Sequence, residues 1–388
     1  MAPTKIRKIA VLSGKRGGYG AMRPMMREIC RCPYNRLQLI VTDQHLDTKF
    51  GKTESEVEAE FEISGRIPMD QKGDTNSERV TALGICLVGI AQTLQKLEPD
   101  ILVLFGDRGE SLVGAMGAIN MGIPIAHIQG GDISGNVDDL MRNAITKLAH
   151  LHFASNEKSA KRLIGLGENA DCIFNVGDCH VDSIVNGEYT NERNVRKKFD
   201  VQSDQRLGIV LQHPETMSGR DSYSDMKGTI KAVTSVFDKT IIIYPCSDQG
   251  HDGIIRAINE HKDAKSVAIY RNIDATDFLG LLSIASMLIG NSSAGIIESP
   301  YFRLPVINLG ERQSGRLHSE NVIHAEFGEK PITEAIGLID TDMAFSKGLD
   351  NLTIHYGSGG SGKRIASILA EVDLSKDLLS KREDVISQ

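Results

Sequence analysis

Short apolar runs alternate with amphipathic stretches of helix length, and this alternation constrains the fold more than any other feature of the sequence. In the first half the runs lie at residues 6–14, 37–43, 101–107, 124–131, 151–156 and 173–178. Between them lie patterns such as 77–97, where Ser77 can cap a helix and apolar residues recur at helical spacing. Nearly continuous apolar strands separated by helices are typical of a parallel sheet covered on both faces.

The stretch 181–206 breaks the alternation, because it is polar and charged, and we predict a domain linker there. The pattern restarts with runs at 207–214, 240–248, 266–272, 287–293 and 305–310. We therefore expect an α/β protein with two doubly wound, Rossmann-like domains, at residues 1–180 and 207–363, facing a cleft. The final segment, 364–388, contains a helix from Arg364 to about Val372 that we expect to pack back toward the N-terminal domain.

Composition excludes several classes of partner. The formal net charge of −7 argues against a nucleic acid or an anionic membrane. The N-terminal apolar run is too short to span a membrane and has no small-residue cleavage site, so we expect a cytoplasmic protein. The six cysteines are scattered without the spacing of a zinc site, which predicts free thiols and no metal.

Polar residues gather where the first-domain runs end. Residues 13–20 are glycine-rich, carry Lys15 and Arg16, and lead into a helix, which suits a phosphate but equally describes a plain strand–helix turn. Asp107 ends one run, and Gln129 and Asp132 follow the next. The pair Asp138-Asp139 comes shortly after, with Arg142 at the spacing of a helical ion pair.

The second domain repeats this arrangement. His213 follows one run, and the segment 290–295 leads directly into a predicted helix at 296–302. Small hydroxyl residues before a helix suit an anion, and two arginines after a later run can clamp a diphosphate. The candidate binding residues are Gly290, Asn291, Ser292, Ser293, Gly295, Glu298, Arg312, Gln313 and Arg316.

Taken together, these segments resemble the hydrolysing UDP-N-acetylglucosamine 2-epimerases of sialic-acid and related nonulosonic-acid biosynthesis. The motifs that carry the resemblance are GDR at 106–108, HIQGGDISGNVDD at 127–139, QHP at 212–214, GNSSAGIIE at 290–298 and INLGERQSGR at 307–316. The resemblance implies a glycosyltransferase-B-like (GT-B-like) fold, and a homodimer or homotetramer. For an oligomer, the apolar helix at 80–97 can form an interface or belong to the core.

The resemblance also implies a reaction that needs neither metal nor nicotinamide cofactor. UDP-N-acetylglucosamine loses its C2 proton and UDP by anti elimination, and water adds to the resulting glycal to give free N-acetylmannosamine. Asp107 and Asp138 would exchange protons, and His213 would contact the diphosphate or the sugar. Arg16, Ser292, Ser293 and Arg312 would hold phosphates, and Glu298 the ribose.

The sequence departs from the family pattern at three places, one of them residues 138–143, where DDLMRN replaces DDSIRH. Gly17 and Gly18 replace an Ala-acid pair, and Gln129 replaces a catalytic Glu, although a glutamine amide cannot exchange protons at neutral pH. Family members acting on 2,4-diacetamido-2,4,6-trideoxy sugars often carry His at that position. Three explanations are open: Asp132 or Asp139 supplies the carboxylate, the substrate is a modified UDP-N-acetylglucosamine, or hydration is slow and some glycal escapes.

Four alternative functions also fit the pattern. The first is the same reaction on UDP-2,4-diacetamido-2,4,6-trideoxy-glucose, and the second is a non-hydrolysing 2-epimerase. A GT-B glycosyltransferase and a non-catalytic UDP-sugar binder are the others.

Overall fold

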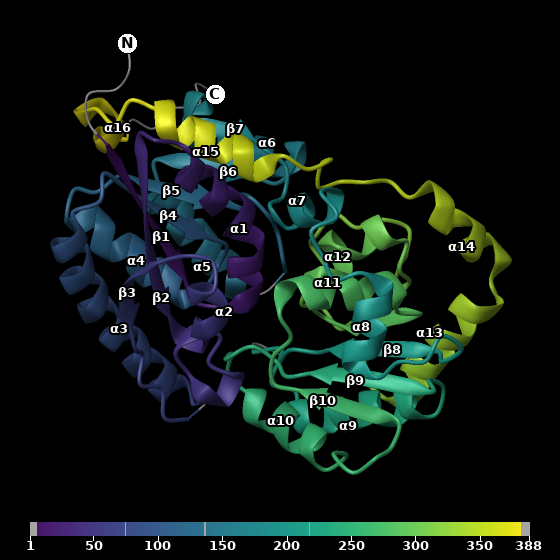
Figure 1. Cartoon of the computed structure of the whole chain (residues 1–388). Coiled ribbons are helices and arrows are strands. Elements are labelled where there is room, and N and C mark those ends of the chain that lie inside the picture. The colour runs from purple at the N-terminus through teal and green to yellow at the C-terminus, as the bar shows by residue number, and fades with distance from the viewer. Residues whose placement is uncertain (1–5, 74, 136, 217, 382–388) are drawn as a thin grey trace.

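Two parallel sheets, each covered by helices, form two domains that lie side by side (Figure 1). The computed structural model describes residues 6–73, 75–135, 137–216 and 218–381. All strand pairs in both sheets are parallel. This is the α/β, GT-B-like arrangement that the sequence predicts.

The N-terminal sheet has seven strands in the order β3-β2-β1-β4-β5-β6-β7. They are β1 (Arg7–Ser13), β2 (Asn35–Thr42), β3 (Ile63–Ile67), β4 (Ile101–Phe105), β5 (Ile125–Ile128), β6 (Leu151–Ala154) and β7 (Ile173–Asn175). The six predicted runs supply six of these strands, but β3 was not predicted. Its sequence ISGRI contains glycine and arginine and only Ile67 is fully buried, because β3 is an edge strand.

The C-terminal sheet has six strands in the order β10-β9-β8-β11-β12-β13. They are β8 (Leu207–Leu211), β9 (Lys239–Ile243), β10 (Val267–Tyr270), β11 (Met287–Gly290), β12 (Val306–Leu309) and β13 (Val322–Ala325). The unpredicted strand is again at an edge: β13 is four residues long, and its His324 is exposed.

Helices cover both faces of each sheet. In the N-terminal half these are α1 (Arg16–Arg31), α2 (Glu54–Glu58), α3 (Asn76–Leu97), α4 (Gly109–Asn120), α5 (Val137–Leu148), α6 (Glu157–Gly165), α7 (His180–Val185) and α8 (Glu192–Phe199). In the C-terminal half they are α9 (Ser222–Thr234), α10 (His251–Asn259), α11 (Ala275–Ile284), α12 (Ala294–Ile297), α13 (Glu329–Thr341), α14 (Met343–Gly348), α15 (Ser361–Glu371) and α16 (Lys376–Ser380). The predicted helix at 296–302 is instead the short α12 followed by a 3₁₀ turn, Ser299–Phe302.

Helix α3 begins at a different cap from the one predicted. Thr75, not Ser77, accepts a hydrogen bond from the Glu78 amide, and the Glu78 carboxylate accepts one from the Thr75 amide. This reciprocal pair satisfies two amides that the first turn leaves free, whereas Ser77 lies inside the helix.

By length and composition alone α3 is apolar enough to cross a membrane. One of its faces packs into the N-terminal core, while Val80 and Val88 on another are 67% and 60% exposed. The predicted oligomer stays a prediction.

The polar stretch 181–206 holds most of α7 and all of α8. The charged side chains of α8 are largely exposed, whereas Asp182 of α7 is buried. Val181, Val195 and Phe199 are buried in the core of the C-terminal domain. The apolar residues here are too sparse to stand out in the sequence. They nevertheless recur at helical spacing, so each short helix buries one face.

The chain crosses back to the N-terminal domain at its end (Figure 1). Helix α15 lies against α1, and its Ile365 and Leu369 are fully buried with Met25 and Ile29 in the N-terminal core. The two domains are therefore joined by a second chain connection besides the one at α7 and α8.

This packing predicts that α15 is part of the N-terminal domain's stability. Leu369→Ala should lower the free energy of unfolding by about 2–5 kcal/mol, because it removes a fully buried side chain and leaves a cavity. Urea unfolding followed by circular dichroism measures the change. Met343→Ala, at a side chain that is 71% exposed, is the control and should stay within about 0.5 kcal/mol of the parent. Equal stability of the two variants would contradict the packing.

Candidate active site

The strand order of each sheet reverses once, and these two reversal points face one another. They lie between β1 and β4 in the first sheet and between β8 and β11 in the second. Loops at the carboxyl ends of strands diverge at such a point and leave a crevice. A cavity of about 1420 Å³, open solvent included, is lined by both sets of loops. It therefore combines residues from the two domains.

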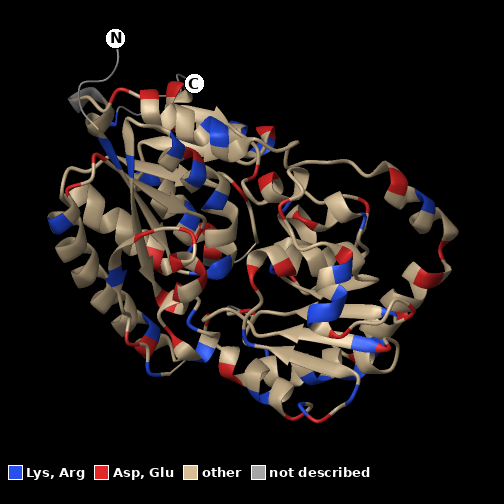
Figure 2. Ribbon diagram, viewed as in Figure 1, with Lys and Arg blue, Asp and Glu red and all other residues tan. Residues whose placement is uncertain are grey.

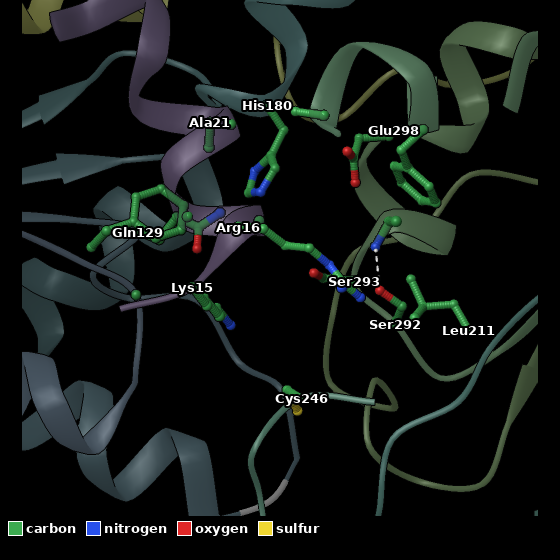
Figure 3. A pocket seen from close by; sticks show the side chains of 18 of the residues that line it. Lys15, Arg16, Ala21, Gln129, His180, Leu211, Cys246, Ser292, Ser293 and Glu298 are labelled. Atoms are coloured by element: carbon green, nitrogen blue, oxygen red, sulfur yellow. Dashed lines mark hydrogen bonds between the residues drawn. The ribbon is translucent and has the colours of Figure 1, made fainter. Parts of the chain in front are cut away.

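Eleven of the predicted site residues line this cavity. They are Arg16, Asp107, Gln129, Asp138, His213, Ser292, Ser293, Glu298, Arg312, Gln313 and Arg316. Figure 3 shows Gln129 and Lys15 on one side and Ser292, Ser293 and Glu298 on the other, with Arg16 extending between them. The motifs that carried the sequence prediction thus meet in one place.

Four other predicted residues, Asp132, Gly290, Asn291 and Gly295, lie behind the wall. The buried Asn291 side chain accepts the His213 amide at 2.6 Å and donates to the His213 carbonyl at 3.0 Å, which ties the loops after β8 and β11 together. Gly290 has a φ of +143°, and a Cβ there would lie 2.1 Å from the Leu211 carbonyl oxygen. Gly295 packs against Val306. These residues shape the wall rather than contact a ligand.

Neither Asp132 nor Asp139 supplies a carboxylate to the cavity. Asp132 is only 4% exposed and accepts from the Ser159 hydroxyl at 2.6 Å, with Arg316 at 3.4 Å. Asp139 accepts the amides of Ser134 and Gly135 and pairs with Arg142. The expectation that one of them replaces the missing Glu is not supported by their positions.

A fully buried guanidinium, Arg142, holds the first cavity carboxylate, Asp107. Arg142 forms the helical ion pair that the spacing predicted, with Asp139, and it also pairs with Asp107. Burial alone would raise the pKa of Asp107, but the charges of Arg142 and Lys15 outweigh burial and hold this pKa well below its usual range. Asp107 is therefore an anion throughout the physiological pH range.

The second cavity carboxylate, Asp138, has the opposite environment. Burial, and then the negative charge of Asp107, raise the pKa of Asp138, while Arg312 at 3.4 Å offsets part of the effect. Two neighbouring carboxyl groups whose pKa values are driven apart can take different roles in proton transfer. Asp138 is the better proton acceptor and Asp107 the permanent negative charge.

Positive charge on the other wall comes from the C-terminal domain. Arg312 lies 3.3 Å from the Asn291 carbonyl and 3.7 Å from Asp248, close to the hydroxyls of Ser292 and Ser293 that line the same cavity. Basic and acidic residues are mixed over both domains (Figure 2), so individual ion pairs set the local field. Cations and hydroxyls in this arrangement suit a diphosphate. Among the described residues, no group of three or more His, Cys, Asp or Glu is placed to hold a metal ion.

Arg16 reaches across the cleft to the main chain of the other domain. Its guanidinium donates to the carbonyls of Arg271 at 2.9 Å and Tyr244 at 3.1 Å, and to Asn272 Oδ1 at 3.0 Å. Burial lowers the pKa of Arg16 to about 10. Arg16 thus lines the cavity while joining the two domains.

The sequence did not single out a histidine–aspartate pair beside Gln129. Asp178 accepts the Gln129 amide at 2.7 Å on one oxygen and His180 Nδ1 at 2.7 Å on the other. Burial would raise the pKa of Asp178, but His180 outweighs burial and lowers it to about 2. The one available signal was position: Asp178 ends a predicted strand run, at the sheet edge where Asp107 and Gln129 also lie.

The chain is similar to several known proteins over most of its length. The family model for UDP-N-acetylglucosamine 2-epimerase matches residues 27–370. A UDP-N,N'-diacetylbacillosamine 2-epimerase (hydrolyzing) of Legionella pneumophila is 33% identical, over 97% of this chain and 99% of that protein. The GDP/UDP-N,N'-diacetylbacillosamine 2-epimerase (hydrolyzing) of Campylobacter jejuni is 32% identical, over 88% and 87%.

A solved structure shares the fold. The Neisseria meningitidis UDP-GlcNAc 2-epimerase bound to UDP-GlcNAc superimposes with a TM-score of 0.78 at 16% identity, covering 94% of this chain and 100% of that one. With the family model spanning most of the sequence, this chain belongs to the UDP-N-acetylglucosamine 2-epimerase family.

Proposed function

We propose that this chain is a hydrolysing 2-epimerase whose substrate is UDP-2,4-diacetamido-2,4,6-trideoxy-glucose. Its products would be UDP and the free sugar inverted at C2. One observation carries the reaction type: Asp107 and Asp138, with pKa values driven in opposite directions, face the cations of the other domain. The names of the Legionella and Campylobacter relatives support this choice of sugar over UDP-N-acetylglucosamine.

The C-terminal wall suits the UDP part of the substrate. Arg312 and the hydroxyls of Ser292 and Ser293 would hold the diphosphate, and Glu298 would accept hydrogen bonds from the ribose. Apolar side chains of the same domain, including Phe278 and Leu279, also line the cavity and provide a surface for the base.

The N-terminal wall suits a sugar that is apolar at C6 and bulky at C4. Phe105, Gly17, Gly18 and Ala21 line this side, and a Cβ on Gly17 would meet nothing within 4 Å. A 6-deoxy sugar presents a methyl group where N-acetylglucosamine presents a hydroxyl, and the 4-acetamido group needs additional room. Small apolar residues on this wall favour the C6 methyl group and leave room for the 4-acetamido group.

The chemistry then follows from the charges. Asp138 accepts the C2 proton while the bond between C1 and the UDP oxygen breaks, and Arg312 and Lys15 stabilise the departing diphosphate. The resulting glycal takes a water oxygen at C1 and a proton at C2. Asp107 stays ionised and keeps the pKa of Asp138 high enough for it to act as a base.

The substrate assignment predicts the outcome of proton NMR in deuterated water. With UDP-2,4-diacetamido-2,4,6-trideoxy-glucose, we expect released UDP and a free 2-epimerised sugar that carries deuterium at C2. UDP-N-acetylglucosamine, run in parallel, should show a kcat/KM about tenfold or more lower, the effect of losing one favourable contact. Equal kcat/KM for the two sugars would contradict the substrate, and intact nucleotide sugar in both samples would contradict the reaction.

The raised pKa of Asp138 predicts the acid limb of the pH–rate profile. Because the base must be unprotonated, UDP release should fall as pH drops through a pKa that lies above the ordinary aspartate value of 3.8. Asp107→Asn removes a negative charge that raises this pKa, so the limb should move to lower pH even though the maximal rate falls. Asp350→Asn, at an exposed ion pair with Arg303, is the control. If the acid limb of the pH–rate profile stays at the same pH in Asp107→Asn, the group whose titration causes this limb is not Asp138.

A further inference from the structure

We propose that His180, held by Asp178, is the second proton-exchanging residue of this enzyme and donates the proton that C2 receives when water adds to the glycal. The inference rests on the proposed function and extends it. It names a residue pair, Asp178 and His180, to which neither the sequence pattern nor the reaction chemistry had given a role.

Inversion at C2 requires two groups that exchange protons. The proton leaves one face of the sugar ring and a proton arrives on the opposite face, so one carboxylate fixed on one side cannot perform both transfers. Asp138 is suited to the first transfer. A different side chain must supply the second.

Three of the other polar residues of the cavity, Gln129, Asp107 and His213, are poorly suited to donate this proton. The Gln129 amide cannot exchange protons at neutral pH. Asp107 is held ionised by Arg142, so it carries no proton to give. His213 Nδ1 accepts the Cys246 amide at 3.1 Å, and burial lowers the pKa of His213 well below its usual value, so it is neutral.

His180, in contrast, is oriented for proton transfer. Its Nδ1 lies 2.7 Å from Asp178 Oδ1, which also accepts the His180 amide at 2.9 Å. The Phe105 and His180 rings pack in a T-shaped arrangement, with centroids 5.6 Å apart and planes at 67°. With Nδ1 bound to a carboxylate, the proton that can move is on Nε2. The ring extends into the cavity near Gln129 (Figure 3).

The charges around His180 favour its protonated form. The groups that face it are Asp178, Glu298 from the C-terminal domain, and Arg316. Burial lowers the pKa of His180, but Asp178 and then Glu298 outweigh burial and Arg316, so the net effect raises it. Gln129 completes the arrangement by donating to the second oxygen of Asp178, which makes Gln129 and Asp178 positioning residues.

The protons balance over one turnover. In elimination the C2 proton passes to Asp138 and on to solvent. In hydration the water oxygen bonds to C1, the electron pair of the C1–C2 double bond takes the Nε2 proton of His180, and the water loses a proton to solvent. Solvent then reprotonates His180, so one proton is released in net along with UDP.

His180→Gln tests the assignment with UDP-2,4-diacetamido-2,4,6-trideoxy-glucose in deuterated water. We expect UDP release within about threefold of the parent, while the ratio of free sugar to released glycal falls about 100-fold, the scale of a lost general acid. His261→Gln, at a histidine that follows α10 and whose Nδ1 lies 2.9 Å from the Ala257 carbonyl oxygen, should retain the parent ratio. Calorimetric titration with UDP checks that each variant keeps its binding site.

Two outcomes would overturn the proposal. One is free sugar from His180→Gln at the parent rate, and the other is loss of UDP release together with hydration. Absence of UDP release by the parent enzyme would instead refute the proposed function, so the two failures are distinguishable.

A second pair of variants separates proton donation from a structural role. Asp178→Asn should lower the pH at which hydration declines on the alkaline side, because the charge that favours protonated His180 is gone. His180→Ala should regain hydration when imidazole is added. An unmoved alkaline limb, or no recovery with imidazole in a variant that still binds UDP, would also overturn the assignment.

Discussion

The N-terminal wall of the cavity depends on one buried cation, the guanidinium of Arg142. It is completely buried and pairs with Asp107 and Asp139, and it also donates to the Asp132 carbonyl and the Ser134 hydroxyl. An unpaired buried charge is strongly destabilising, so these partners are obligatory. Through them Arg142 helps keep Asp107 ionised. Burial, and then the charge of Asp107, raise the pKa of Asp138, so Arg142 influences both carboxyl groups.

The site also depends on contact between the domains, because each contributes only half of it. Asp138 belongs to the first domain, but Arg312, which lies beside it and lowers its pKa, belongs to the second. Arg16 bonds to main-chain carbonyls across the cleft, and the buried Arg108 pairs there with Asp248. The acid–base properties of the cavity therefore depend on the contact between the two domains.

Most of the fold follows from hydrophobic patterning. Eleven predicted runs overlap eleven strands, because the central strands are buried on both faces and must be almost wholly apolar. The edge strands β7 and β10 are only partly buried but keep apolar residues, so they were found. The edge strands β3 and β13 were missed because they also carry residues such as Arg66 and His324. Helices α7 and α8 were missed for a related reason: each is short and buries only a few side chains in an otherwise charged stretch.

The sequence by itself determined the two parallel sheets and the loops that line the cavity, since chain order and apolar spacing dictate both. It could not decide which polar residues of those loops face the cavity. Asp132 and Asn291 turn into the wall, where buried polar groups need partners, while Asp107 and Asp138 face the cavity. Only the tertiary structure brought Asp178 and His180 beside Gln129, because that contact joins the ends of β5 and β7, strands separated in the sheet by β6.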